Sequence, residues 1–173
     1  MKKVVLMVMV LVTSFMAVGF AATKAKDIQF RLVLSDDEAK STASKKYSYA
    51  SRQGQAPKEI TVSNNALLSA GDIESMIVVR KEDTRLKDYP MVDIVFNKEG
   101  SQKLADISEK NLRRSIAVVI GDEVLTAPYI IYPLTRGHFM LSNWKIDTDE
   151  SARKLISDMG FTPLFKEDLK NIK

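Results

Sequence analysis

The longest apolar stretch of the sequence lies close to its first residue. Two lysines precede the uncharged residues 4–20, and Gly19 and Ala21 place small side chains at positions −3 and −1 of a cleavage site. A positive region, an apolar run and small residues in this order are typical of a secretory signal peptide. We predict such a peptide over residues 1–21, removed after Ala21. An uncleaved membrane anchor is the alternative, because a run of about 17 residues reaches the lower limit for a spanning helix.

Short β-rich segments with alternating apolar positions recur through the rest of the chain and predict strands. One long polar stretch, residues 36–55, interrupts them, and we expect a loop or weak helix there, the least ordered part of the domain. A Gly121-Asp122 turn should join a hairpin, and Ala127-Pro128 should end its pairing. The expected strands are residues 28–34, 58–63, 73–80, 91–96, 115–120, 123–126 and 138–142.

Two segments carry apolar residues at helical spacing. In the first, Asn97 is a suitable N-cap, and the helix should run to about residue 113 or 114. In the second, Asp147 should be the N-cap with Glu150 completing a capping box, and Gly160 should end the helix. The expected apolar faces consist of Leu104, Ile107 and Leu112 in the first helix, and of Ala152, Leu155, Ile156 and Met159 in the second.

The order of these elements is strands, a helix, a hairpin, further strands and a helix, which predicts an α+β fold. We expect a mainly antiparallel sheet with two helices packed on one face, in a split βαβ-like arrangement. Residues 22–57 would form a strand and a flexible lead-in, residues 58–165 the α+β domain, and residues 166–173 a charged tail.

Composition narrows the range of partners. The sequence has 26 basic and 22 acidic residues, and two of the lysines lie in the predicted signal peptide, so the mature chain is close to neutral. A nucleic-acid partner is not expected, because it would require a clustered basic face. The chain has no cysteine, so its fold must rest on the burial of apolar side chains rather than on disulfides.

Few residues offer catalytic or metal-binding chemistry. His138 is the only histidine, and without cysteine it cannot form a multi-histidine or thiolate metal site, so we expect it to be structural. Glycine-rich phosphate-binding motifs and the nucleophile elbow are absent, so we predict no cofactor, no metal site and no enzymatic activity. A carboxylate pair at Asp122 and Glu123 is the candidate for an alternative function, an envelope hydrolase. Turns and helix starts also explain such acidic clusters.

The stretch from Val92 to Ser142 resembles the head region of the first periplasmic domain of SecD, a subunit of the protein-export translocase. The similar features are a strand that ends in Phe, a Gly at the helix start, an Asn near the helix end, an apolar strand, Thr-Ala-Pro and a downstream Gly. The FRLV strand from Phe30, the Gly71-Asp72 segment and the Gly-x-x-Pro exit are also similar. The matching positions, which we interpret as structural, include Phe96, Gly100, Asn111, Ala127, Pro128, Gly137, Gly160 and Pro163.

The resemblance implies a periplasmic or secreted domain linked to protein export or the cell envelope. We expect it to bind a polypeptide or an envelope protein partner through an exposed strand edge or an apolar groove near Tyr129, Tyr132, Phe139 and Trp144. For Trp144 the alternative is a ring folded over the sheet edge.

Two differences from the family bear on this expectation. The hairpin turn has the order Gly-Asp rather than Asp-Gly, and the family continues after the Gly-x-x-Pro exit into a transmembrane bundle, whereas this sequence has the charged residues 166–173. A further alternative is therefore an accessory subunit that docks on a membrane translocase. Residues 1–21 occupy the place of the family's first membrane helix, so membrane association through them is also expected.

Overall fold

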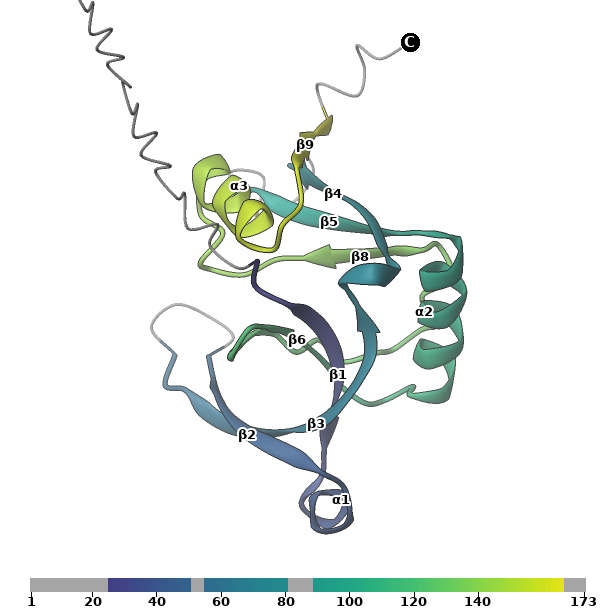
Figure 1. Cartoon of the computed structure of the whole chain (residues 1–173). Coiled ribbons are helices and arrows are strands. Elements are labelled where there is room, and N and C mark those ends of the chain that lie inside the picture. Colours follow the sequence, from purple (N-terminus) through teal and green to yellow (C-terminus); the bar gives the residue numbers. More distant parts are fainter. Residues whose placement is uncertain (1–24, 51–54, 81–88, 167–173) are drawn as a thin grey trace, which may run out of the picture.

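The computed structural model describes residues 25–50, 55–80 and 89–166, and their strands form two sheets (Figure 1). The predicted signal peptide and all but the first residue of the predicted tail lie outside the described residues. One sheet has the order β2-β3-β1-β6-β7, and the other has the order β8-β5-β4-β9. The strands are β1 (Ile28–Leu34), β2 (Ser44–Tyr49), β3 (Lys58–Ser69), β4 (Ile73–Val79), β5 (Met91–Phe96), β6 (Ile116–Ile120), β7 (Glu123–Thr126), β8 (His138–Leu141) and β9 (Pro163–Phe165).

The predicted α+β class is confirmed, and all strand pairs are antiparallel except β4 with β9. Of the three α-helices in the described residues, α1 (Asp36–Ser41) is short, and α2 (Lys98–Lys110) and α3 (Asp149–Asp158) are longer. The main hydrophobic core lies between the two sheets and includes Leu104 of α2 and Ile156 of α3. The division of the strands between two sheets was not apparent from the sequence.

Both faces of the five-stranded sheet are buried. One face contributes Ile28 and Phe30 of the central strand β1 to the main core. On the other face the sheet curls (Figure 1). Its edge strands β2 and β7 contact each other, and both contribute to a second core. Lys45 Nζ lies 2.8 Å from Asp122 Oδ1 and connects β2 to the turn before β7. The second core consists of Tyr47, Tyr49, Val62, Ala117, Val119 and Val124.

Only one face of the four-stranded sheet belongs to a core. Alternate residues of its strands point into the main core, because side chains alternate between the faces of a strand. These inward residues include Met76, Val78, Val92, Ile94, Phe139 and Leu141. The residues between them form the outer face, and none of Ile77, Val79, Asp93, Val95 and Met140 is part of either core. Of these residues, Met140 is exposed, and the other four are half-buried.

A short 3-10 helix, η1 (Ala70–Asp72), joins the two sheets and fixes the start of α2. The Asp72 carboxylate accepts hydrogen bonds from Ser69 N at 2.9 Å and from Lys103 Nζ at 2.8 Å. Burial raises the pKa of Asp72, but the hydrogen bonds from Lys103 and Ser69 outweigh burial, so the pKa lies below its usual value. Asn97 caps α2 as predicted, because its Oδ1 accepts from Gly100 N at 2.8 Å.

Residues 36–50 of the polar stretch have more secondary structure than the sequence indicates. The weak-helix alternative is correct for α1, where Ser35 and Glu38 form a capping box. The loop prediction is wrong for β2, which pairs with β3 along its whole length. The expected strand at residues 58–63 is too short, because β3 continues to Ser69 and forms an irregular ladder with β1.

Both long helices differ from prediction at one end. Helix α2 ends at Lys110, three or four residues early, because Asn111 is its C-cap and Arg113 adopts a positive φ of 62°. Leu112 is therefore exposed rather than part of the apolar face. Helix α3 is capped by Thr148 with Ser151, rather than by Asp147 with Glu150.

Candidate functional site

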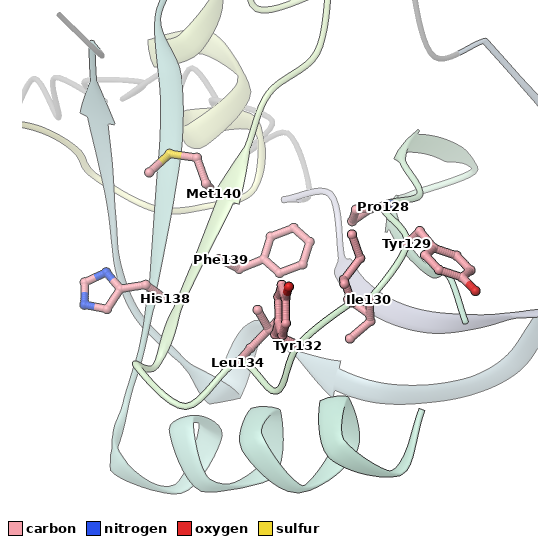
Figure 2. A pocket seen from close by; sticks show the side chains of 9 residues that line it. Pro128, Tyr129, Ile130, Tyr132, Leu134, His138, Phe139 and Met140 are labelled. Carbon is pink, nitrogen blue, oxygen red and sulfur yellow. The ribbon is translucent and has the colours of Figure 1, made fainter. Parts of the chain in front are cut away.

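The segment between β7 and β8 lines an apolar groove of about 280 Å³ together with β8 itself (Figure 2). Backbone hydrogen bonds hold this segment against the end of α2: Ile130 N donates to Arg114 O, and Arg113 N donates to Ile130 O, both at 2.8 Å. Leu134 N donates to the buried Ser108 Oγ at 2.7 Å. The groove is lined by Pro128, Tyr129, Ile130, Ile131, Tyr132, Leu134, His138, Phe139 and Met140.

Gly137 sets the position of β8 beside the groove. Its φ is +68°, a left-handed conformation that favours glycine, and a Cβ there would lie 2.3 Å from Ser101 Oγ. Its carbonyl accepts from Phe96 N at 2.9 Å, which starts the ladder between β8 and β5. A side chain at this turn would be strained and would require a shift of Ser101 or of the chain, which gives a physical reason for a glycine here.

Among the described strands, β8 is at the edge of its sheet and is paired on one side only, with β5. In an antiparallel ladder, hydrogen-bonded pairs alternate with non-hydrogen-bonded pairs. Because Phe96 and Gly137 are bonded, the pairs Ile94–Phe139 and Val92–Leu141 are also of the bonded kind. The backbone N–H and C=O groups of His138 and Met140 therefore face away from β5, toward the free edge.

Aromatic and aliphatic side chains give the groove its chemistry. Phe139 is only 5% exposed and is part of the groove floor, and its ring packs edge-on against Phe30 at a centroid distance of 5.2 Å. Tyr129, Ile131 and Tyr132 are 57%, 65% and 76% exposed. Figure 2 shows Phe139 directed toward Tyr132, Leu134 and Ile130, with Tyr129 directed away. Such a group of exposed apolar side chains is typical of an interaction surface.

Three of the four predicted binding residues thus line the groove, and Trp144 does not. Trp144 is 40% exposed and lies in the loop after β8, with Lys145 Nζ at 5.4 Å from its ring centroid. The neighbouring Asn143 donates its side-chain amide to Leu125 O on β7. The structure therefore separates Trp144 from the lining side chains that the sequence grouped with it.

Next to the groove, the side chains of His138 and Asp93 are in contact. His138 Nδ1 lies 3.0 Å from Asp93 Oδ2. His138 is exposed, and its side chain points away from the Phe139 side of β8 (Figure 2). The other carboxylate oxygen of Asp93 is buried and has no hydrogen-bond partner. Buried polar atoms without a partner are rare in proteins.

The carboxylates considered for hydrolysis do not form a catalytic pair. Asp122 is paired with Lys45, and Glu123 is paired with Lys145. The hydrogen bond and the charge of Lys45 lower the pKa of Asp122, whereas a general acid needs a raised pKa. Among the described residues, no group of three or more His, Cys, Asp or Glu side chains is arranged to hold a metal ion.

The remaining family-matching residues lie at junctions of the fold. A Cβ at Gly100 would lie 2.2 Å from Asp72 O, so α2 can contact η1 only through a glycine. Gly160 follows α3 with a φ of +83°. Asn111 donates its side-chain amide to Ile107 O at 2.8 Å and caps α2. Phe96 is buried in the main core, Ala127 packs against the second core, Pro128 begins the groove segment, and Pro163 begins β9.

Sequence reasoning missed Ile130, Ile131, Leu134 and Met140 of the groove. Their apolar character is visible in the sequence, but a hydrophobic residue near a predicted strand is normally assigned to the buried core. The pattern Tyr-Ile-Ile-Tyr-Pro-Leu at residues 129–134 has neither helical nor strand periodicity. That irregularity is the signal that marks the segment.

No helix in the described part of the chain is long and apolar enough to cross a membrane.

Most of the chain is similar in sequence to known proteins. A family model described as SecDF, P1 head subdomain, matches residues 44–158. Protein translocase subunit SecD of Acidaminococcus fermentans is 30% identical over 115 residues, which cover 61% of this chain and 27% of that protein. SecD of Anaeromyxobacter dehalogenans is 32% identical over 84 residues, which cover 44% and 14%. The chain therefore spans about a quarter or less of the length of these relatives.

Structural comparison gives the same fold. A solved structure of SecDF, described as a membrane component that enhances protein export, has a TM-score of 0.58 at 16% identity and covers 81% of this chain and 64% of that one. SecDF in its super-membrane-facing form has a TM-score of 0.54 at 17% identity, with 79% and 19% covered. These similarities show that the arrangement of the two sheets and their helices is shared.

Proposed function

This chain belongs to the SecDF P1 head subdomain family, and on that premise we propose that it binds extended, apolar segments of polypeptide during protein export. The bound segment lies in the groove and extends the four-stranded sheet at the free edge of β8. The observation that carries the proposal is the coincidence of an unpaired strand edge with exposed apolar side chains in the same groove.

The free edge supports recognition that is independent of sequence. An extended peptide that adds to an exposed sheet edge is bound mainly through main-chain hydrogen bonds, which every polypeptide can form. His138 and Met140, which line the groove, offer such groups at the free edge of β8. An export component that handles many different polypeptides needs this kind of contact.

The groove lining supports a preference for apolar segments. Exposed tyrosine side chains bury a large area at low cost in conformational entropy, and the exposed Ile131 adds an aliphatic contact. Segments that are still unfolded expose such apolar side chains, whereas folded proteins bury them. We propose that this difference makes the groove selective for polypeptide that has not yet folded.

Fluorescence anisotropy with a fluorescein-labelled ten-residue peptide of alternating leucine and serine tests the proposal. We expect saturable binding, and Tyr132→Ala should weaken it roughly fivefold or more, because a hot-spot truncation costs about 1 kcal/mol or more. Tyr89→Ala is the matched control, since Tyr89 is a tyrosine that is 50% exposed and is not part of the groove lining. Absence of binding, or equal loss in both variants, would refute the proposal.

Strand addition predicts a dependence on the peptide backbone. An added strand uses the N–H groups of alternate residues toward β8 and leaves the others toward solvent. Two versions of the peptide, N-methylated at even or at odd positions, have the same composition but block opposite edges. We expect one version to retain more affinity than the other if the peptide has a fixed register. Equal affinity of both versions with the unmethylated peptide would exclude strand addition.

We propose that the domain acts without catalysis on the far side of the membrane, since P1 denotes the first periplasmic domain of the family. Mass spectrometry of the protein from cells addresses the location: an N-terminus at Ala22 indicates release, and retention of Lys2 indicates an anchor. Docking on a membrane translocase is the second candidate, favoured by the relatives being translocase subunits. Co-purification of a translocase from solubilised membranes, lost with Tyr132→Ala, would favour it over free polypeptide.

A further inference from the structure

The outer face of the four-stranded sheet carries one carboxylate among apolar side chains. Strand register places Asp93 of β5 directly between Ile77 of β4 and Met140 of β8, with Val95 two residues further along β5. None of these four residues belongs to either hydrophobic core. Asp93 is thus an acidic group among apolar side chains that belong to neither core.

The Asp93 carboxylate is only half satisfied. Its Oδ2 lies 3.0 Å from Nδ1 of His138, while its Oδ1 is buried and has no hydrogen-bond partner. A buried carboxylate oxygen normally accepts a hydrogen bond, and a cationic donor gives the strongest one. Within the described residues, His138 is the only basic side chain in contact with this carboxylate. Asp93 Oδ1 is therefore a carboxylate oxygen on this face that can accept a hydrogen bond and has no donor among the described residues.

The position of Asp93 relative to the groove indicates which group could donate a hydrogen bond to its Oδ1. A strand added at the free edge of β8 places alternate side chains on this outer face, next to Met140 and two strand spacings, or roughly 10 Å, from Asp93. Lysine and arginine have long flexible stems with donors at their ends. Met140 stands between the two positions, is 40% exposed, and has rotatable bonds that allow it to move aside.

We propose that the extended segment bound at β8 carries a lysine or arginine whose side chain crosses Met140 and pairs with Asp93 Oδ1. This inference rests on the proposed function and names the segment more closely: an apolar stretch with one basic side chain. Overall electrostatics do not produce the preference, because the mature chain is close to neutral with a slight basic excess and so does not attract cations at long range. A preference for a basic residue must therefore come from a local acceptor such as Asp93.

The experiment compares two fluorescein-labelled peptides of alternating leucine and serine, in which one central serine is replaced by lysine or by norleucine. Norleucine keeps the aliphatic stem and removes the charge. Anisotropy titrations with the full chain at low salt should give a roughly fivefold lower Kd for the lysine peptide. Asp93→Asn should abolish this ratio and leave the Kd of the norleucine peptide unchanged.

Asp106→Asn is the matched control, because it removes the same charge from an exposed position on α2, where Asp106 accepts from Gln102. It should keep the fivefold ratio, and thermal unfolding should show that both variants are folded. Equal affinity of the wild-type chain for the two peptides, or an unchanged ratio in Asp93→Asn, overturns this inference and leaves the groove in place. Binding of neither peptide overturns the proposed function and this inference with it.

Discussion

The two sheets share one core but differ in what their other faces do. The five-stranded sheet curls on itself and buries its second face in a core of its own, and Lys45 connects its edge strand to the turn before β7. The four-stranded sheet has an outer face with a partly unsatisfied carboxylate and an edge strand beside an apolar groove. Within the described residues, the five-stranded sheet has both faces in a core, whereas the four-stranded sheet has one face in a core and one free edge strand beside the groove.

The difference separates stability from binding within one small domain. Where a sheet is closed on both faces, substitutions should change the free energy of unfolding and little else. Where a sheet offers an edge and an exposed face, substitutions should change affinity at small cost in stability, because exposed side chains contribute little to folding. The following variants test this division, in order of the expected loss of stability.

Phe30→Ala should have the largest effect. Its ring is fully buried and contacts Phe96 and Phe139 at centroid distances of 5.4 and 5.2 Å, so it connects the two sheets. Removal of a buried phenylalanine ring costs about 3–5 kcal/mol. Urea denaturation measures the loss, with Leu112→Ala as the exposed control. A loss below about 1 kcal/mol would contradict a shared core between the sheets.

Asp72→Asn tests the junction between the sheets and should cost about 2 kcal/mol at neutral pH, because it removes charge-assisted hydrogen bonds from Lys103 and Ser69. The lowered pKa of Asp72 means that its stabilisation is fully present above the unfolded pKa of about 3.9 and is lost as pH falls toward the folded value. The gap between wild type and variant should therefore narrow in acid. Glu99→Gln, which removes the exposed partner of Lys103, should change little.

Val119→Ala should cost about 1.5 kcal/mol, because it removes two buried methyl groups from the second core. The same variant should bind the leucine–serine peptide with unchanged affinity, since Val119 faces away from the core that the groove adjoins. Parallel denaturation and anisotropy measurements check both statements. A loss of affinity without unfolding would show that the curled sheet also takes part in binding.

Tyr132→Ala should have the smallest effect on stability, within about 0.5 kcal/mol, because the side chain is 76% exposed. Its effect on peptide affinity should nevertheless exceed that of Val119→Ala. The two variants thus have opposite rank in the two measurements. The same rank in both would remove the distinction between the sheets.

Local pattern was sufficient for the strands that combine alternation with clear ends. The predicted bounds of β1, β5 and β7 agree with the structure because apolar positions alternate or cluster there and turn residues follow. Strand β2 was missed because Tyr47 and Tyr49 are its only aromatic or aliphatic side chains and its partner β3 does not begin until Lys58. An edge strand of this kind is specified by pairing, which a local window cannot detect.

The groove was predicted only in part, for a similar reason. Tyr129, Tyr132 and Phe139 were grouped because they are aromatic and close in sequence, and the structure does bring them to one groove. Hydrophobicity alone does not distinguish the buried Phe139 from the exposed Ile131. Asp93 reads as an ordinary solvent-facing residue of an alternating strand, and its unpaired oxygen depends on neighbours from two other strands.

The place of β1 in the five-stranded sheet has a consequence for the timing of folding. This strand is the first in the chain but the central one in its sheet, between β3 and β6. As residues emerge in order from a ribosome or an export channel, β1 has no second neighbour until Ile120 has emerged. Such sequence-distant pairing slows folding. The five-stranded sheet of a domain that we propose to receive unfolded segments therefore cannot be complete until more than half of the chain has emerged.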